Sequence, residues 1–423
     1  GPAGLSCAFY LAEKGYKPVV FEKNERPGGM LTYGIPSFKL QKDVIEAEVE
    51  VIRLMGAEFR YGVEVGRDVT LDELREQGFK AFYVAIGCQG GRLAGIPGED
   101  AEDVTVAVDF LREVNSGKID ALPGRTIVVG GGNVAIDVAR NACRLGSEHV
   151  EMFCLESEAQ MPASEEERRE AIEDGAHISC GWGPKEVHLD EAGRVCGITF
   201  KRCTRVYDDE GRFAPEYDEN DLRRVDANRV VMSIGQSIVW GDLLAGSKVE
   251  LGRGQGALAD PQTYQTAEPD IFVGGDVYTG PSFAIDAIAA GHEAAVSIHR
   301  FVQPGSTLTI GRNQRRYTAL DRDDVVIESY DNASREVAHV DREREKAAPF
   351  SEYVETFTEE QVRAETARCL GCGASIVDPN KCIGCGLCTT KCAFDAIHLD
   401  RDRPECSTMV KYEQKLPSLG KYA

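Results

Sequence analysis

The sequence lacks an excess of basic residues. Its 423 residues include 48 Lys and Arg against 70 Asp and Glu, which gives a formal net charge of −22. Nucleic-acid phosphates and anionic lipids are bound through Lys and Arg, and a strongly negative surface repels both. We therefore expect neither a nucleic acid nor an anionic membrane as a partner.

Long apolar runs are missing too. No stretch approaches the roughly 20 apolar residues that a membrane-spanning helix needs, and no basic and then apolar leader stands at the start. The balance of 42% hydrophobic and 28% charged residues is typical of a globular protein. The length suffices for about two to four domains. These features predict a cytoplasmic protein without a membrane span.

Two further kinds of motif are absent. The 7 histidines show no metal-ligand spacing such as H-E-x-x-H, and no C-x-x-C or C-x-x-x-x-C pair lies near the glycine-rich motifs described below. The second absence argues against a reductase that relays electrons through a protein dithiol. Isolated cysteines such as Cys7, Cys143 and Cys154 are therefore predicted to be packing residues.

The chain opens on GPAGLSCAFYLAEKGY, which matches the end of a phosphate-binding loop and the helix after it. Gly1 and Gly4 fit the second and third glycines of G-x-G-x-x-G, and Glu22 ends the strand PVVFE where an acid would accept from a ribose hydroxyl. The glycines let pyrophosphate oxygens approach the backbone N–H groups of the helix N-terminus. The preceding strand would have to stand before Gly1, so we expect a fragment of a longer polypeptide.

Three later segments extend this first dinucleotide site. They are the Gly28-Gly29 loop in ERPGGMLTYGIP, the strand AFYVAIG that ends in Gly87, and DIFVGGDVYTG with Gly275 and Asp276. Each cluster alone is equally compatible with an ordinary tight turn. In this order they look like the FAD domain of the two-dinucleotide-binding flavoproteins, in which the residue at the place of Asp276 contacts the ribityl–phosphate region of the flavin.

The second motif is complete. In GRTIVVGGGNVAIDVARNACRLG an apolar strand runs into Gly130-x-Gly132-x-x-Ala135 and then into a helix with apolar positions at 134, 138 and 142. A further strand, HVEMFCLES, ends at Glu156, where a carboxylate would accept both hydroxyls of an adenosine ribose. This unit is predicted to bind a nicotinamide nucleotide and to be inserted into the first domain.

Seven of the 14 cysteines crowd between Cys369 and Cys406, after an Arg-, Asp- and Glu-rich stretch that is typical of a linker. Cys382, Cys385, Cys388 and Cys392 have the spacing of bacterial [4Fe–4S] ligation. Zinc ribbons place two C-x-x-C pairs farther apart, which disfavours zinc.

A second iron–sulfur cluster is left open. Cys369 and Cys372 form an incomplete upstream set, and Cys406 lies downstream. In two-cluster ferredoxins the fourth cysteine of a run serves the other cluster, so Cys392 could join the upstream pair. Spacing alone does not assign each thiol to a cluster. Ala393 replaces the proline that usually follows such a run.

The order GPAGLS, ERPGGMLTYGIPSFKL, IPGED, VVGGGNVAIDVA, MPA, SIGQS and VGGDVYTGP is similar to the small (beta) subunit of NADPH-dependent glutamate synthase and its relatives, over roughly residues 1 to 305. Those relatives include the flavin–nicotinamide portions of dihydropyrimidine dehydrogenase and of electron-bifurcating ferredoxin–NADP oxidoreductases. The resemblance implies that the nicotinamide stacks on the flavin and passes it a hydride without a protein acid or base.

Two positions depart from that family. Its NADP-using members carry a pair of arginines where this chain has Leu155 and Glu156, so NADH is favoured over NADPH. The alternative is that Glu156 is a solvated strand end and that Arg140 or Arg168 reaches a phosphate. The iron–sulfur cysteines of the glutamate synthase subunit precede the flavin domain, whereas here they follow it.

We expect an α/β fold of two nested Rossmann-like domains, each with three layers around a parallel sheet, and a small ferredoxin-like iron–sulfur domain. The expected boundaries are 1–120 with 235–305 for the FAD domain, 121–234 for the NAD(P) domain, 306–360 for a linker and 361–423 for the iron–sulfur domain.

The implied activity is hydride transfer between NADH and FAD, followed by single-electron transfer through one or two [4Fe–4S] clusters. The electrons would pass to a partner subunit, a ferredoxin or a part of the same polypeptide before Gly1. Alternatives are the electron-input subunit of a glutamate synthase-like, selenate reductase-like or molybdenum-hydroxylase-associated complex, a bifurcating oxidoreductase, and a non-catalytic assembly subunit.

Overall fold

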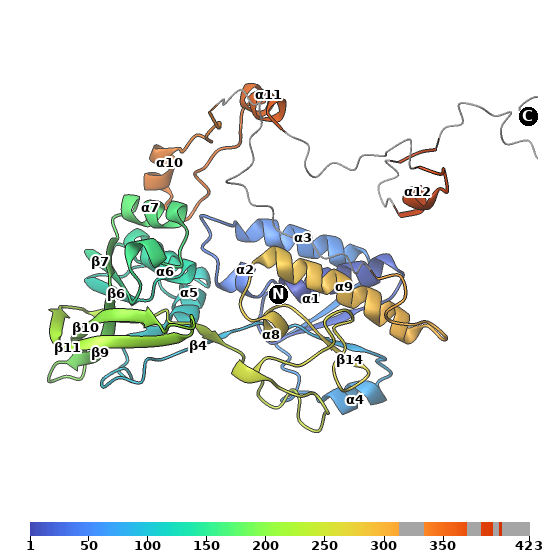
Figure 1. Cartoon of the computed structure of the whole chain (residues 1–423), viewed down its shortest axis with the longest axis horizontal. Helices are drawn as coiled ribbons and strands as arrows, with labels where there is room; N and C mark the ends of the chain where they lie inside the picture. The colour runs from blue at the N-terminus through green and yellow to red at the C-terminus, as the bar shows by residue number, and fades with distance from the viewer. Residues whose placement is uncertain (313–333, 370–381, 392–396, 400–423) are drawn as a thin grey trace, which may run out of the picture. The chain divides into compact units, whose positions relative to one another are not determined.

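The computed structural model describes residues 1–312, 334–369, 382–391 and 397–399 (Figure 1). The chain divides into two units. The first combines Gly1–Val325 with Ala338–Thr356, and the second combines Val326–Val337 with Phe357–Ala423. Within the described residues, no helix has the length and apolar character required to cross a membrane.

The first unit begins with a helix pair formed by segments far apart in sequence. Helix α1 (Pro2–Glu13) packs against α9 (Ala284–Val302), and the Ser6 hydroxyl donates to the Ile288 carbonyl oxygen at 2.7 Å. The helices are so close that a Cβ on Gly291 would stand 2.3 Å from the carbonyl oxygen of Ala3. Glycine is therefore required at this crossing, although it is a poor helix former.

Short parallel strand pairs lie beside these helices. Strand β1 (Val19–Glu22) pairs with β2 (Glu58–Tyr61), and β3 (Phe82–Val84) pairs with β14 (Ile271–Val273). The three side chains of β14 are fully buried, which explains its uniformly apolar sequence. The remaining helices of this region are α2 (Met30–Tyr33), α3 (Lys42–Leu54), α4 (Leu71–Glu76) and α8 (Asp276–Thr279).

The central part of the chain forms a five-stranded parallel sheet. Its strand order is β5-β12-β6-β7-β8. Helices α5 (Ala107–Asn115), α6 (Asn133–Arg144) and α7 (Glu165–Glu173) accompany it, and α6 buries its Ala, Ile and Val side chains in the core. The strands are β5 (Val104–Val106), β6 (Arg125–Val129), β7 (His149–Cys154), β8 (His177–Cys180) and β12 (Arg229–Met232).

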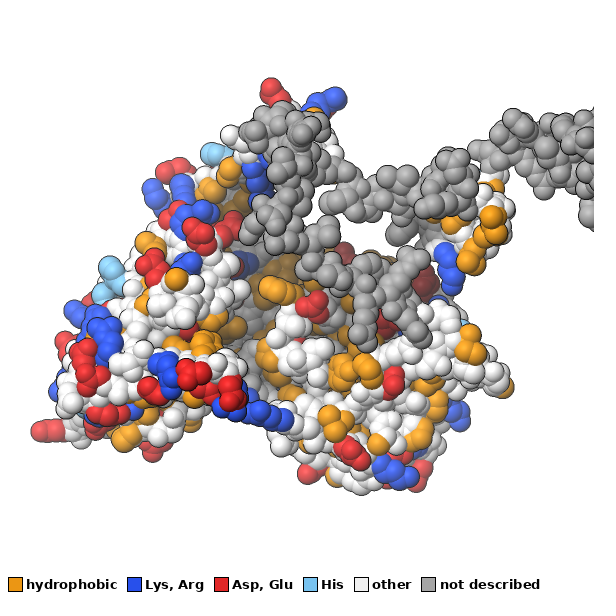
Figure 2. Space-filling model, in the orientation of Figure 1, with side chains coloured by type: hydrophobic (Ala, Val, Ile, Leu, Met, Phe, Trp, Pro, Cys, Tyr) orange, Lys and Arg blue, Asp and Glu red, His pale blue; other side chains and the backbone are white. Residues whose placement is uncertain are grey.

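A second, antiparallel sheet packs on this parallel one. It consists of β9 (Trp182–Leu189), β10 (Val195–Tyr207) and β11 (Phe213–Val225), in the order β11-β10-β9. The rings of Phe153 and Phe200 stack between the two sheets with centroids 3.9 Å apart, and both are fully buried. Acidic and basic side chains are interspersed over this part of the surface in Figure 2.

The two dinucleotide-type domains are nested. The chain leaves the first at β4 (Gly90–Gly91) and returns at β13 (Gln236–Ser237), and these strands pair antiparallel. The expected α/β fold with two nested Rossmann-like domains is therefore confirmed. Strand β5 lies in the nucleotide-domain sheet although it precedes the expected boundary at 121.

Part of the expected linker belongs to the first unit. Residues 338–356, with α10 (Arg342–Ala347), contact α6 and the 38–41 loop. The second unit contains α11 (Glu359–Ala367), capped by Thr358, and the short α12 (Leu387–Lys391).

Candidate active site

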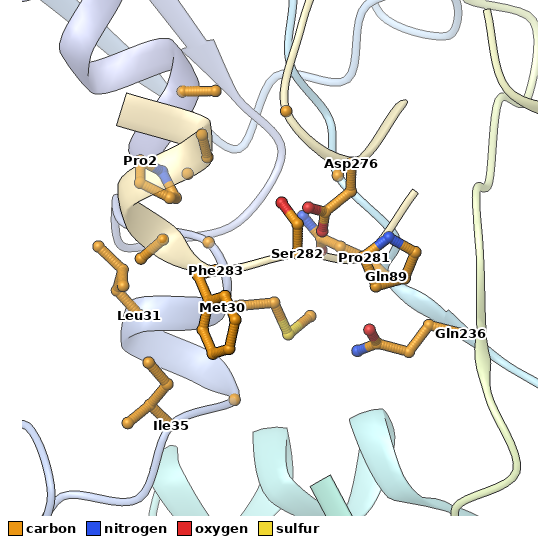
Figure 3. A pocket seen from close by; sticks show the side chains of 18 of the residues that line it. Pro2, Met30, Leu31, Ile35, Gln89, Gln236, Asp276, Pro281, Ser282 and Phe283 are labelled. Atoms are coloured by element: carbon orange, nitrogen blue, oxygen red, sulfur yellow. The ribbon is translucent and has the colours of Figure 1, made fainter. Parts of the chain in front are cut away.

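A cavity of about 220 Å³ lies where α1, α2, α8 and α9 face the nucleotide domain (Figure 3). Its wall contains five of the residues predicted to bind the flavin, although they come from four separate segments. They are Gly1, Gly29, Gly87, Gly275 and Asp276. The fold thus brings glycine turns that are far apart in the sequence to the wall of one cavity.

The glycines are needed for this close approach. A Cβ on Gly29, whose φ is 58°, would stand 2.8 Å from the Cα of Gly1. A Cβ on Gly275, with a φ of 65°, would stand 3.1 Å from the Cβ of Ala3. Side chains would both strain the backbone and fill the cradle between the segments. Backbone N–H groups beside an open cavity fit the phosphates of a dinucleotide.

Asp276 begins α8 at the edge of this cradle. A Cβ on Gly87 would lie 3.8 Å from its Oδ2. Burial raises the pKa of the Asp276 carboxyl, while backbone hydrogen bonds from Ser282 and Cys88 act in the opposite direction. A half-buried carboxylate in this position can accept hydrogen bonds from hydroxyl groups of a bound cofactor.

Three other predicted flavin residues do not line this cavity. A Cβ on Gly4 would make an ordinary 3.7 Å contact with the Cβ of Ala85. Gly28 has a φ of 110°, and a Cβ there would stand 2.2 Å from the Thr32 hydroxyl. Glu22 ends β1 and accepts from the backbone N–H of Asn24 at 3.0 Å. Their roles in cofactor binding stay predictions.

The second fingerprint forms the turn between β6 and α6. Gly130 has a φ of 141°, and a Cβ there would stand 2.2 Å from the carbonyl oxygen of Ser233. Gly132 caps α6, and a Cβ there would meet nothing within 4 Å. Ala135 lies in the first turn of α6 and is fully buried. Gly130 thus serves the turn itself, whereas Gly132 leaves the space in front of the helix free.

Glu156 lies beside this loop. A Cβ on Gly131 would stand 3.1 Å from its Oε2, so the carboxylate is close to the place where an adenosine ribose is expected. Cys154, two residues earlier, is buried, and its Sγ lies 3.7 Å from the Sγ of Cys180 on the neighbouring strand.

The structure gives both arginines of the alternative interpretation other partners. The Arg140 side chain is only 1% exposed; its Nε donates to Asp174 at 2.8 Å and its Nη2 to the Tyr353 hydroxyl at 2.6 Å. Arg168 Nη1 donates to the carbonyl oxygen of Glu158 at 2.6 Å. Arg140 is thus held by buried partners and does not line the cavity.

Several cavity residues were not predicted from the sequence. Met30, Phe283 and Gln236 converge on the middle of the cavity in Figure 3, and Val134 and Asp137 reach it from α6. Asp137 lies in a motif that the sequence identified, but one carboxylate within an amphipathic helix gives no signal by itself.

Asp137 joins the two domains. Its Oδ1 accepts from Lys39 Nζ at 2.6 Å, and Lys39 also pairs with Glu167. Burial raises the pKa of Asp137 to about 6, although Lys39 counteracts the shift. Burial alone would lower the pKa of Lys39, but the two carboxylates raise it above its usual value.

Three predicted iron ligands fall within the described residues of the run. Cys382, Cys385 and Cys388 are exposed, and Gly384 and Gly386 have φ angles of 65° and 77°. Left-handed glycines on both sides of Cys385 let the chain turn between successive thiols, and thiolates suit iron–sulfur clusters. No group of three or more metal-ligating side chains is assembled within the described ranges.

The other predicted ligands are Cys369, Cys372 and Cys392, and the role of Cys406 is left open. Cys369 follows α11 and is exposed. Cys372, Cys392 and Cys406 lie outside the described residues. The ligand set and the number of clusters therefore stay predictions.

Glycine cradles, nested domains and a cysteine run together define the class of protein to which this chain belongs. The chain belongs to the pyridine nucleotide-disulphide oxidoreductase family, whose model matches residues 1–291, and a 4Fe–4S binding domain matches residues 375–398. It is an oxidoreductase of the FAD- and NAD(P)H-linked kind with an iron–sulfur domain.

Sequence similarity to individual proteins agrees with this class. The chain is 34% identical to the NADP(+)-dependent formate dehydrogenase subunit beta of Moorella thermoacetica, over 88% of this chain and 53% of that protein. It is 34% identical to the glutamate synthase [NADPH] small chain of Escherichia coli K12, over 72% of this chain and 67% of that one. The NAD-dependent dihydropyrimidine dehydrogenase subunit PreT of the same organism is 32% identical, over 72% and 67%.

These matches confirm the resemblance to the glutamate synthase small subunit and its relatives. The chain spans about half the length of the formate dehydrogenase subunit. Among solved structures, FprA of Mycobacterium tuberculosis shares the fold, with a TM-score of 0.61 and 18% identity over 71% of this chain and 83% of that one.

Proposed function

We propose that this chain transfers a hydride between NADH and FAD and passes the electrons on, one at a time, through a [4Fe–4S] centre to a redox partner. FAD, when bound, supplies the conversion between two-electron and one-electron chemistry. The partner would be a separate subunit, a ferredoxin or another part of the same polypeptide. The names of two of the relatives, a subunit beta and a small chain, support a multi-subunit setting.

One observation carries the proposal: the cavity is lined both by glycines predicted to bind the flavin and by α6, the helix that begins at the second dinucleotide motif. Gly1, Gly29 and Gly275 line it from the first domain, and Val134 and Asp137 line it from the helix that Gly132 caps. A flavin and a nicotinamide held on these two sides would meet between the domains. The protein then binds and orients the flavin and the nicotinamide and excludes water from between them. No side chain is required as an acid or base.

Glu156 supports NADH as the nucleotide. A carboxylate beside the loop accepts ribose hydroxyls and repels a 2′-phosphate. The buried ion pairs of Arg140 remove one of the two candidates for binding that phosphate. The relatives are named for NADP(+), NADPH and NAD in turn, so the family does not decide the nucleotide.

A role as the electron-input subunit of a larger complex is compatible with this proposal. Flavin-based bifurcation is a second candidate and would need a second flavin or a tuned pair of clusters. A non-catalytic assembly subunit is disfavoured, because the glycine cradles of both domains are intact.

The test is an anaerobic titration of the purified protein with NADH and, separately, NADPH, followed by visible absorbance and low-temperature EPR. We expect NADH to bleach the flavin band and then to produce a reduced-cluster signal. Reduction by NADPH alone would refute the nucleotide assignment and leave the relay intact. A bound flavin that neither nucleotide reduces would refute the catalytic proposal.

A further inference from the structure

The segment 338–356, called the strap below, folds back on itself instead of running freely to the iron–sulfur unit. Asp341 N–H donates to the carbonyl oxygen of Tyr353 at 2.8 Å, and Glu355 N–H donates to that of His339 at 2.8 Å. Between these ends lie α10 and the Pro349–Phe350 turn. Tyr353 is 6% exposed, so the strap has a core residue of its own.

On one side the strap holds α6 of the nucleotide domain. The Tyr353 hydroxyl accepts from Arg140 Nη2 at 2.6 Å. Arg144, with a side chain 5% exposed, donates from Nη1 to the carbonyl oxygen of Pro349 and from Nη2 to Glu345, each at 2.7 Å. Buried guanidinium groups need every such partner, because a desolvated charge is costly.

On the other side the strap meets a loop of the flavin domain. Phe38 is 4% exposed, and the guanidinium carbons of Arg140 and Arg144 lie 4.8 and 4.2 Å from its ring centroid. Gln41 Nε2 donates to the carbonyl oxygen of Phe350 at 3.3 Å. The flavin-domain loop, α6 and the strap thus share one cation–π and hydrogen-bonded cluster.

This cluster adjoins the cavity wall. Lys39, next to Phe38, makes the interdomain ion pair with Asp137, one turn of α6 before Arg140. Asp137 itself lines the cavity. A displacement of Phe38 on α6 would therefore also move Lys39, whose partner Asp137 lines the cavity where the two cofactors are proposed to meet.

We propose that the strap is a positioning element for hydride transfer: by holding Phe38 and Lys39 against α6, it fixes the nucleotide domain relative to the flavin cavity. The inference rests on the proposed function, because hydride transfer requires the two rings in near contact. It assigns a task to a segment that the sequence predicts to be a linker. Tyr353, Arg140 and Phe38 are positioning residues, since none of them lines the cavity.

The test compares Tyr353→Ala with Tyr353→Phe in the full-length flavoprotein. The alanine removes the ring and the hydroxyl that hold Arg140, whereas phenylalanine keeps the ring packing. Glu343→Gln is the matched control, because Glu343 belongs to the same segment but is 91% exposed and, among the residues that the structure describes, forms an ion pair only with Lys346. Stopped-flow reduction by NADH and by NADPH gives the limiting rate and the apparent dissociation constant separately.

We expect Tyr353→Ala to lower the limiting rate of flavin reduction by about tenfold or more, since a misplacement of about 1 Å can cost 10²-fold. FAD content and reduction by dithionite, which needs no nucleotide domain, should not change. Amide hydrogen exchange in residues 36–42 should accelerate. Tyr353→Phe and the control should remain close to the unaltered protein.

A normal limiting rate in Tyr353→Ala, or unchanged exchange in residues 36–42, would overturn the proposal. Equal losses of FAD content and of dithionite reduction would also overturn it, because they indicate a purely structural role. If Tyr353→Ala does not fold, Phe38→Leu probes the same cluster from the flavin side with the same outcomes. If neither nucleotide reduces the unaltered protein, the proposed function fails, while the exchange experiment still decides whether the strap holds the loop.

Discussion

Gly130 and Gly132 stand two residues apart in one loop, yet the structure predicts opposite consequences for their replacement by alanine. In Gly130→Ala the new Cβ would stand 2.2 Å from the Ser233 carbonyl oxygen, at a backbone φ of 141°. Backbone strain and overpacking together should destabilise the fold by about 2–6 kcal/mol. We expect a lower melting temperature, with weak nucleotide binding as a secondary effect.

In Gly132→Ala the new Cβ would meet nothing within 4 Å. Stability should stay within about 0.5 kcal/mol of the unaltered protein. The methyl group would instead occupy the space at the α6 N-terminus that a pyrophosphate needs. A steric cost of about 1–3 kcal/mol would raise the dissociation constant for NADH about 5- to 150-fold.

The two variants are compared by thermal unfolding, FAD content and titration with NADH. The expected pattern is an unstable Gly130→Ala and a stable Gly132→Ala that binds FAD but little NADH. Equal destabilisation by both substitutions would show that the loop differs from the one described. Normal NADH binding by Gly132→Ala would refute the assignment of this helix N-terminus to the nucleotide phosphates.

Three further predictions concern the nucleotide, the cavity wall and the helix crossing. Glu156→Arg should shift kcat/KM toward NADPH relative to NADH by about tenfold or more, since a guanidinium pairs with a 2′-phosphate that the carboxylate repels; an unchanged ratio in steady-state assays would contradict the nucleotide assignment. Because burial raises the pKa of Asp137 to about 6, flavin reduction should slow as the pH falls through that value and Asp137 loses its ion pair with Lys39. Among the described residues, the charged groups that interact with Asp137 include Lys39, Glu167, Arg140 and Lys42. The inflection should vanish in Asp137→Asn, and its persistence there would assign it to another group. Gly291→Ala should lower the melting temperature although alanine is favoured in helices by about 1 kcal/mol, because the Cβ would stand 2.3 Å from the Ala3 carbonyl oxygen; a rise in melting temperature would show that α1 and α9 can separate at no cost.

The sequence was sufficient to predict the nested fold, because the motifs that indicate this fold are local. A glycine turn between an apolar strand and an amphipathic helix constrains the backbone within about ten residues, and GRTIVVGGGNVAIDVA shows all three parts together. The order of such motifs along the chain then indicates which domain is inserted into which. The thiol spacing of the C-terminal run is equally local.

The cavity wall and the strap could not be predicted, because they depend on contacts between distant segments. Phe38, Arg144 and Tyr353 are an ordinary aromatic, a helix-end arginine and a tyrosine in a polar stretch when each is read in its own surroundings. Only the fold makes them neighbours. The antiparallel sheet was missed for a related reason, since β11 is largely exposed and carries little apolar alternation.

The discontinuity of the flavin domain also determines the order in which the chain can fold during synthesis. The five strands of the nucleotide-domain sheet lie between Val104 and Met232, so that sheet can close while the ribosome is still making β14 and α9. Helix α1 can pack in its final place only after α9 has been made. The Ser6–Ile288 hydrogen bond between these helices joins residues more than 280 positions apart. Domains generally fold as units as they emerge. A newly made chain therefore has a closed nucleotide domain before it has a place for a flavin, and flavin uptake can serve as a marker that synthesis has passed α9.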